Sequence, residues 1–290
     1  MTAVAEQTVI TEPGVYDIPE ADYHADPVPG GSLSASGAKK LLDCPARFAY
    51  EREHPPQPTP AMEQGTAVHK LVLGKGADLV LIDADSYRTK AAREAADAAR
   101  AAGQVPLLPA DMERAQAIAD AVLAHPVAGR LFDPEHGVPE RSLFWRDELT
   151  GVQRRARVDW MPFLGQYQRR MVIADLKTCA SASRQSIAKA VANFGYHIQA
   201  DWYLGGVRAL GLDDDPAFVF VFAETAPPYI VTLAQLDQDA MATGHAAGRR
   251  AIERYRDCTE SGRWPGYSGR ADDIELISLP PWAARTEEYA

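Results

Sequence analysis

Two charged residues lie two positions apart in an otherwise apolar stretch of this chain. Residues Val172–Thr178 read Val-Ile-Ala-Asp-Leu-Lys-Thr, a composition that predicts a buried β-strand. Because successive side chains of a strand point to opposite faces, Asp175 and Lys177 point the same way, with Cα atoms about 7 Å apart. Burying both charges is costly unless something pairs them. A divalent metal ion with a polarised water molecule would supply such a reason.

Two further polar residues are candidates to join this pair. Asp159 ends a second strand-like run, Arg157–Trp160, and His69 lies in Gly65–Lys70, which predicts the first turns of a helix. Carboxylate oxygens suit Mg²⁺, and imidazole binds metals in its neutral form. Near the start of a helix, the helix dipole would favour the neutral imidazole. A lone histidine on an apolar helix is more often a packed or capping residue, so the ligand role depends on the other residues.

The strands that carry these residues follow from the hydrophobic pattern. Arg141–Arg146 and Val152–Trp160 flank Glu148–Gly151, which has the composition of a hairpin turn. By alternation, Arg155, Arg157 and Asp159 share one face of the second strand, which suits a surface where phosphates lie beside a metal. Glu140 adds an acid near the hairpin, but we do not predict it as a ligand.

The C-terminal half continues with helices and one more hairpin. Two helices, Ser183–Phe194 and Tyr196–Leu210, are separated by Gly195, and a final helix covers Leu236–Arg256. Between them, Ala217–Thr225 and Tyr229–Leu233 predict paired strands.

The N-terminal half is predicted to be mostly helical. A helix capped by Ser34 or Ser36 would run through Tyr50, and the prolines between residues 55 and 60 would form a rigid connector. Tyr87–Ala102 and Ala110–Ala124 are rich in alanine and charge and poor in large apolar residues, which predicts an exposed helical insertion. The basic residues of this insertion are more often an ordinary solvated face than a DNA contact.

The order of these motifs resembles the PD-(D/E)XK nuclease superfamily, with a helical histidine followed by Asp and then Asp-x-Lys. Cys44–Phe48 before the histidine helix and Gln199–Tyr203 after the Asp-x-Lys strand extend the resemblance to the RecE-type phage exonucleases, such as exonuclease VIII. The resemblance covers roughly the whole chain. It implies an α/β fold with a central mixed sheet flanked by helices and a helical insertion at about residues 84–125. The nuclease domain would span 31–270, between a leader (1–30) and a tail (271–290).

The resemblance also implies roles for individual residues. The catalytic residues would be Asp159, Asp175 and Lys177. The metal ligands would be His69, Asp159, Asp175 and the backbone carbonyl of Leu176. The residues that contact DNA would be Gln199, Tyr203, Arg155, Arg157 and Thr178. Lys177 would orient or deprotonate the attacking water, and Mg²⁺, or alternatively Mn²⁺, would be the cofactor.

Composition and charge limit the other classes of function. The chain has 290 residues, a formal net charge of −10 and three cysteines without close spacing, which argues against a disulfide framework and against an iron–sulfur cluster. Nothing resembles a signal peptide or a bilayer-spanning run, so we expect a cytoplasmic protein without a membrane partner, in the host cytoplasm if it is phage-encoded. Between Arg141 and Ala190, ten Lys and Arg residues stand against four Asp and Glu, an excess of six positive charges around the predicted site.

Three functions remain open at this stage. The first is a 5′ to 3′ exodeoxyribonuclease on linear double-stranded DNA that leaves 3′ single-stranded tails for recombination. As in RecE-type enzymes, it would form a ring-like oligomer beside a RecT-like single-strand annealing protein. The others are an endonuclease with the same chemistry and a non-catalytic DNA-binding or assembly module.

Overall fold

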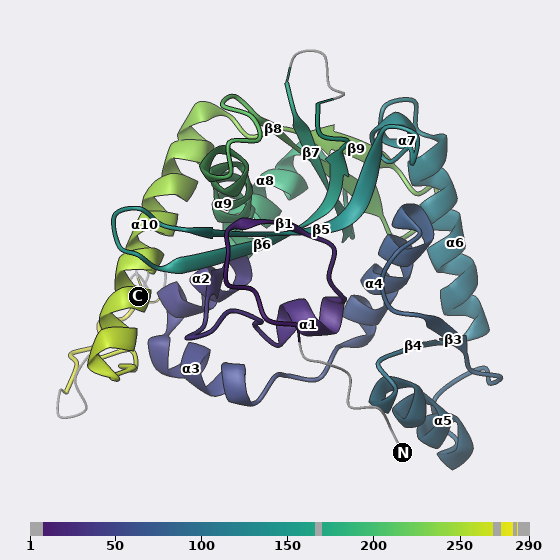
Figure 1. The fold of residues 1–290 in the computed structure, drawn as a ribbon. Helices are drawn as coiled ribbons and strands as arrows, with labels where there is room; N and C mark the ends of the chain where they lie inside the picture. The colour runs from purple at the N-terminus through teal and green to yellow at the C-terminus, as the bar shows by residue number, and fades with distance from the viewer. Residues whose placement is uncertain (1–7, 166–169, 269–273, 281–282, 284–290) are drawn as a thin grey trace, which may run out of the picture.

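A mixed β-sheet runs through the centre of the molecule (Figure 1). The computed structural model describes residues 8–165, 170–268, 274–280 and 283. In these residues the sheet has seven strands: β1 (Gly14–Tyr16), β2 (Leu33–Ser34), β5 (Gly137–Arg146), β6 (Gln153–Pro162), β7 (Val172–Cys179), β8 (Ala217–Glu224) and β9 (Val231–Ala234). Their order is β1-β5-β6-β7-β8-β9, with β2 paired to β6. The β2–β6 and β7–β8 pairs are parallel and the other pairs antiparallel.

Helices cover both faces of this sheet, as the sequence predicted. The helices are α1 (Glu20–His24), α2 (Ala35–Asp43), α3 (Pro45–Glu53), α4 (Pro60–Leu73), α5 (Lys90–Ala101), α6 (Pro109–Ala124), α7 (Ala128–Leu131), α8 (Arg184–Phe194), α9 (Tyr196–Ala209) and α10 (Gln238–Ser261). Helices α2, α9 and α10 pack on one hydrophobic cluster of the sheet, and α4 and α6 pack on the other. The β7 strand therefore lies between two helical layers.

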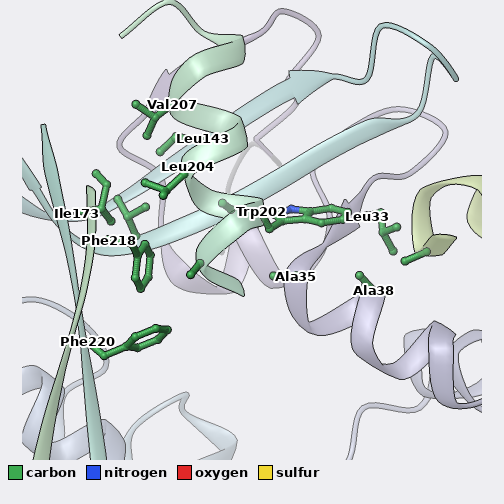
Figure 2. Packing of buried hydrophobic residues seen from close by; sticks show 14 of the residues in the cluster. Leu33, Ala35, Ala38, Leu143, Ile173, Trp202, Leu204, Val207, Phe218 and Phe220 are labelled. Atoms are coloured by element: carbon green, nitrogen blue, oxygen red, sulfur yellow. The ribbon is translucent and has the colours of Figure 1, made fainter. Parts of the chain in front are cut away.

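The sequence of β8 explains why both faces are covered. Its alternating side chains are large and aromatic on one face (Phe218, Phe220, Phe222) and small and aliphatic on the other, and the strand is buried on both. Figure 2 shows Leu204 and Val207 of α9 in the same cluster as Phe218 and Phe220. Truncating a buried phenylalanine of this kind to alanine costs about 3–5 kcal/mol. The β8 strand thus anchors the layer that carries α9.

The predicted hairpins and the two helices around Gly195 are confirmed. The β5–β6 pair joins Arg146 to Gln153 across the predicted turn, and β8 and β9 form the second hairpin. Gly195 has φ 62°, a left-handed conformation that suits glycine, and it ends α8 and begins α9.

Two helix boundaries in the N-terminal half were predicted wrongly. The helix expected to run through Tyr50 is broken into α2 and α3, because Cys44 is extended (φ −157°, ψ 112°) and Pro45 cannot donate a backbone hydrogen bond to α2. The following helix begins at Pro60 rather than after Gly65. Thr59 caps it by accepting from Met62 N at 3.3 Å, and proline is well tolerated at the first helical position.

The region at residues 84–125 is only partly the exposed insertion that the composition suggested. Strands β3 (Leu79–Leu81) and β4 (Val105–Leu107) form a small parallel sheet beside α5. Helix α6, in contrast, buries Ala115, Ile118, Ala119 and Val122 completely in the cluster that also contains Val221 of β8. Small side chains allow close helix packing, so a lack of large apolar residues did not mean exposure.

Parts of the predicted leader and tail lie outside the described residues, namely residues 1–7 and most of 271–290, as does Arg169 in the loop before β7. Among the described helices, none has the length and apolar character needed to cross a lipid bilayer.

Candidate active site

The β7 strand places Asp175 and Lys177 on one face, as their alternation predicted. The Asp175 side chain is 1% exposed and that of Lys177 is 18% exposed, and the two form an ion pair between Lys177 Nζ and Asp175 Oδ2. Because β7 is flanked by β6 and β8, neither residue lies at a sheet edge. The pair therefore lies on an interior strand of the sheet.

Asp159 and His69 lie at the same place. His69 Nε2 is 3.0 Å from Asp159 Oδ2, and Leu176 N donates to the same oxygen at 2.8 Å, which ties Asp159 on β6 to the strand of Asp175 and Lys177. On its other side His69 Nδ1 lies 2.9 Å from Gly65 O, a contact in which Nδ1 must carry the proton. The imidazole therefore directs Nε2 at Asp159.

The helix dipole that was expected to keep His69 neutral does not reach this residue. Because α4 begins at Pro60, His69 lies in the third turn of the helix and outside the reach of the positive helix end. Burial opposes charge on the imidazole, but the Asp159 carboxylate outweighs burial and raises the pKa of His69 to about 9. Without a cation at the site, His69 carries a positive charge at neutral pH.

The two carboxylates differ in their electrostatics. Burial, and then the Asp159 carboxylate, raise the pKa of Asp175 to about 6 against the opposing effect of Lys177. For Asp159, burial also favours the neutral acid, but His69 outweighs it and lowers the pKa. Burial disfavours the charged Lys177, yet Asp175 and Asp159 together raise its pKa. Neighbouring groups whose pKa values are shifted in opposite directions from their ordinary values are typical of functional sites.

Helix α9 brings the predicted glutamine to the site. Gln199 Nε2 donates to Asp175 Oδ1 at 2.5 Å, and both side chains are buried. Tyr203, one turn later, lines a groove beside the site and packs edge-on against Phe218 with ring centroids 5.7 Å apart. In this structure Gln199 therefore orients a carboxylate of the site, while its predicted contact with DNA remains a prediction.

A groove with a volume of about 530 Å³ opens beside these residues. It is lined by the site residues His69, Asp159, Lys177, Gln199 and Tyr203 together with Ser34, Lys39, Lys75, Glu140 and Arg157, among others. A cavity of this size matches those that hold small ligands. The groove gives the clustered residues access to solvent.

Sequence reasoning missed two lysines that line this groove, Lys39 and Lys75. Lys39 on α2 donates to Phe194 O at 2.9 Å, and its Nζ lies 5.8 Å from the centre of the Tyr196 ring, while Lys177 Nζ lies 5.3 Å from the same ring. Burial, and then the nearby Lys177, lower the pKa of Lys39 to about 8. No motif marks Lys39, because only the packing of α2 against α9 brings it to the groove.

The arginines predicted to contact DNA are held by acidic residues. Arg157 lines the groove, and its Nε donates to Glu140 Oε2 at 2.5 Å. Arg155 Nη1 lies 2.8 Å from Asp26 Oδ2 and borders a neighbouring pocket. Thr178 follows Lys177 on β7 and is partly buried. The structure thus brings Arg157 to the site and places Arg155 beside it.

The site offers donors that fit a divalent cation. In the part of the chain that the structure describes, the buried Asp175 Oδ2 accepts no well-formed hydrogen bond beyond its ion pair with Lys177. Carboxylate oxygens beside an imidazole suit Mg²⁺ or Mn²⁺. Within the described ranges, however, no group of three or more His, Cys, Asp or Glu side chains could hold a metal ion by itself. A cation would therefore depend on Asp159 and Asp175 together with other oxygens, such as the Leu176 carbonyl and water.

Comparison with known proteins places the fold. Residues 34–276 match a family model described as "PDDEXK-like domain of unknown function (DUF3799)". A crystal structure described as a "putative exonuclease" from Eubacterium rectale aligns over 94% of this chain and 99% of its own, with a TM-score of 0.60 and 14% identity. The solved structure of SSO0001 aligns over 77% of this chain and 75% of its own at 13% identity. Its TM-score of 0.35 is too low to support a conclusion about the fold. No curated protein matches the chain.

The family match covers most of the chain, from the cap of α2 to beyond α10, and it includes every residue of the cluster around Asp159, Asp175 and Lys177. The fold is a PD-(D/E)XK nuclease fold, as the order of the motifs predicted, although a closer relation to the RecE-type branch does not follow. The chain belongs to this family of PDDEXK-like domains.

Proposed function

We propose that this protein is a metal-dependent nuclease that hydrolyses phosphodiester bonds of DNA. The observation that carries the proposal is the cluster that Asp175 forms with Asp159, Lys177 and His69, the last three of which line one groove. A buried carboxylate beside a second carboxylate and a lysine that are both largely shielded from solvent is expensive to hold together for structure alone. Their position on the central strands of a PD-(D/E)XK fold supports a catalytic role.

Each residue has a task in this proposal. Asp159 and Asp175 would hold Mg²⁺, with Mn²⁺ as an alternative, and the Leu176 carbonyl and His69 would complete their side of the site. When bound, a divalent cation would neutralise the charge that develops on the phosphate during hydrolysis. Lys177 would orient the attacking water through its ammonium donors, and Gln199 would keep Asp175 in position.

The size of the groove supports the entry of a single strand. With about 530 Å³ it is of small-ligand size, so a strand segment rather than an intact duplex would enter it. We therefore propose an exonuclease on linear double-stranded DNA, which would degrade one strand 5′ to 3′ and leave a 3′ tail for strand annealing. The name given to the Eubacterium rectale structure is in line with exonuclease action. The proposed polarity rests on the resemblance to RecE-type enzymes.

The excess of basic residues between Arg141 and Ala190 supports DNA binding less strongly than the sequence suggested. Several of these residues are paired with acids outside that segment: Arg141 with Asp17, Arg155 with Asp26, Arg157 with Glu140, and Arg170 with Asp215. Such pairs reduce the long-range positive field that attracts DNA, although a paired arginine can still donate a hydrogen bond to a phosphate that it contacts directly. We still propose a ring-like homo-oligomer that works beside a RecT-like annealing protein, now supported by the resemblance rather than by charge.

One digestion experiment separates the candidate functions. Purified protein with Mg²⁺ or Mn²⁺ should degrade linear duplex and leave covalently closed relaxed circles intact, and EDTA or Asp175→Asn should abolish degradation. Nicking of closed circles at the same rate would favour the endonuclease. A protein that binds duplex but degrades neither substrate with either metal would leave only the non-catalytic module.

A further inference from the structure

One acidic residue of the groove has a backbone conformation that its side chain disfavours. Glu140 has φ 57°, in the left-handed region that glycine adopts easily and glutamate does not. Among the described non-glycine residues with positive φ, it is the one that lies inside a strand. A conformation of this kind is unfavourable for a residue other than glycine and persists only where the surroundings hold it.

The distortion lies opposite a proposed catalytic residue. The β5–β6 ladder pairs Pro139 with Trp160 and Arg141 with Val158, but it skips the residues between them, Glu140 and Asp159. Glu140 and Asp159 line the same groove. Burial and the Asp159 carboxylate raise the pKa of Glu140, and Arg157 opposes this shift. The irregular backbone therefore directs a carboxylate into the site.

Among the described residues, that carboxylate is hydrogen-bonded to Arg157. Glu140 Oε2 accepts from Arg157 Nε at 2.5 Å, and the two side chains are 12% and 10% exposed. Arg157 Nη1 donates to Ser142 Oγ at 2.9 Å and to Ile18 O at 3.1 Å. These three contacts fix the guanidinium in one orientation at the groove, on the same strand as Asp159 and two residues before it.

We infer that Glu140 is a positioning residue of the proposed nuclease site, which holds the Arg157 guanidinium where it contacts a phosphate of the bound DNA strand. The inference rests on the proposed function. A planar guanidinium with fixed direction recognises phosphate better than a mobile one, because less conformational freedom is lost on binding. A glycine at position 140 would relieve the backbone but could not hold Arg157, which explains why a glutamate occupies a glycine-like conformation.

Three variants at position 140 separate this role from a structural one. Glu140→Ala removes the carboxylate and keeps the unfavourable φ, Glu140→Gly removes both, and Glu140→Gln keeps an acceptor for Arg157. We expect the Ala and Gly variants to raise the KM for linear duplex about tenfold with kcat changed by less than about threefold, and Gln to restore most of the loss. The Gly variant should melt about 2 °C or more above the Ala variant.

Duplex affinity in an Asp175→Asn background measures binding without turnover and completes the test. In an Arg157→Ala background, Glu140→Ala should cause no further loss of affinity, because Glu140 acts through Arg157. Asp257→Ala, which removes an exposed carboxylate paired with Arg256 on α10, is the matched control and should leave KM unchanged.

The outcomes distinguish this inference from the proposed function. If the parent degrades DNA and Glu140→Gly raises the melting temperature without raising KM, Glu140 has no positioning role and the nuclease stands. Additive effects of the Glu140 and Arg157 substitutions would also overturn the inference. A parent that neither degrades nor binds DNA would remove the proposed function, and the inference with it.

Discussion

Gln199 donates a 2.5 Å hydrogen bond to Asp175, which connects helix α9 to the central strand of the sheet across 24 residues of sequence. The contact occupies Asp175 Oδ1 and leaves Oδ2 to Lys177. One carboxylate is thus oriented by a neutral donor on one side and by a cation on the other.

Replacing Asp175 with asparagine should abolish hydrolysis while the fold persists. Asparagine keeps the shape of the side chain but loses the negative charge that the proposed cation and Lys177 need, so we expect kcat to fall at least about 100-fold. Circular dichroism and duplex affinity should stay close to the parent values. Digestion at a rate near that of the parent would show that Asp175 is not at the reacting centre.

Gln199 itself should matter for the rate more than for folding. Gln199→Leu keeps the volume but leaves Asp175 Oδ1 without its donor, and we expect kcat to fall about tenfold or more, with a loss of stability of about 1–3 kcal/mol. Urea denaturation and steady-state digestion measure the two effects. Unchanged kcat together with lost stability would limit Gln199 to a structural role.

Lys177→Met should remove activity without removing DNA binding. Methionine preserves much of the aliphatic stem but no ammonium, so the water near Asp175 would lose its orienting donor, and we expect a loss of about 10²–10⁴-fold in kcat. Duplex affinity, measured by fluorescence anisotropy, should change by less than about threefold. A variant that keeps its rate would exclude Lys177 from the chemistry.

His69→Ala should weaken metal binding more than DNA binding. His69 contacts Asp159, an expected metal ligand, so its loss should raise the Mg²⁺ concentration for half-maximal activity about 10–100-fold. Calorimetric titration of the DNA-free protein with Mn²⁺ gives an independent measure. If parent and variant have the same metal dependence, His69 serves packing alone.

The lowered pKa of Lys39 predicts that the affinity for duplex DNA depends on pH. Its pKa is lowered to about 8 by burial and by Lys177, so its positive charge is present below pH 8 and is lost as pH rises through this value. Between pH 7 and pH 9, affinity for duplex should therefore fall in the parent protein. Lys39→Arg, which keeps its charge over this range, should flatten the profile, whereas an identical profile in both proteins would contradict a role in binding.

The sequence alone was sufficient for the elements that carry the site. Strand alternation placed Asp175 and Lys177 on one face, and turn composition located the hairpins, because both signals act over a few neighbouring residues. The order of motifs also led to the PD-(D/E)XK fold, which the family match confirms. The histidine helix was found, but its start was misplaced because Pro60 was taken as a helix breaker rather than as a first helical residue.

Tertiary structure decided everything that depends on partners distant in sequence. The charge of His69 follows from Asp159, 90 residues away, and the positive excess of the segment from Arg141 to Ala190 is matched by acids such as Asp17 and Asp26 from the N-terminal region. The approach of Lys39 to the groove has the same origin. Pairwise electrostatics and packing depend on distances in the folded chain, and a local residue pattern contains no information about them.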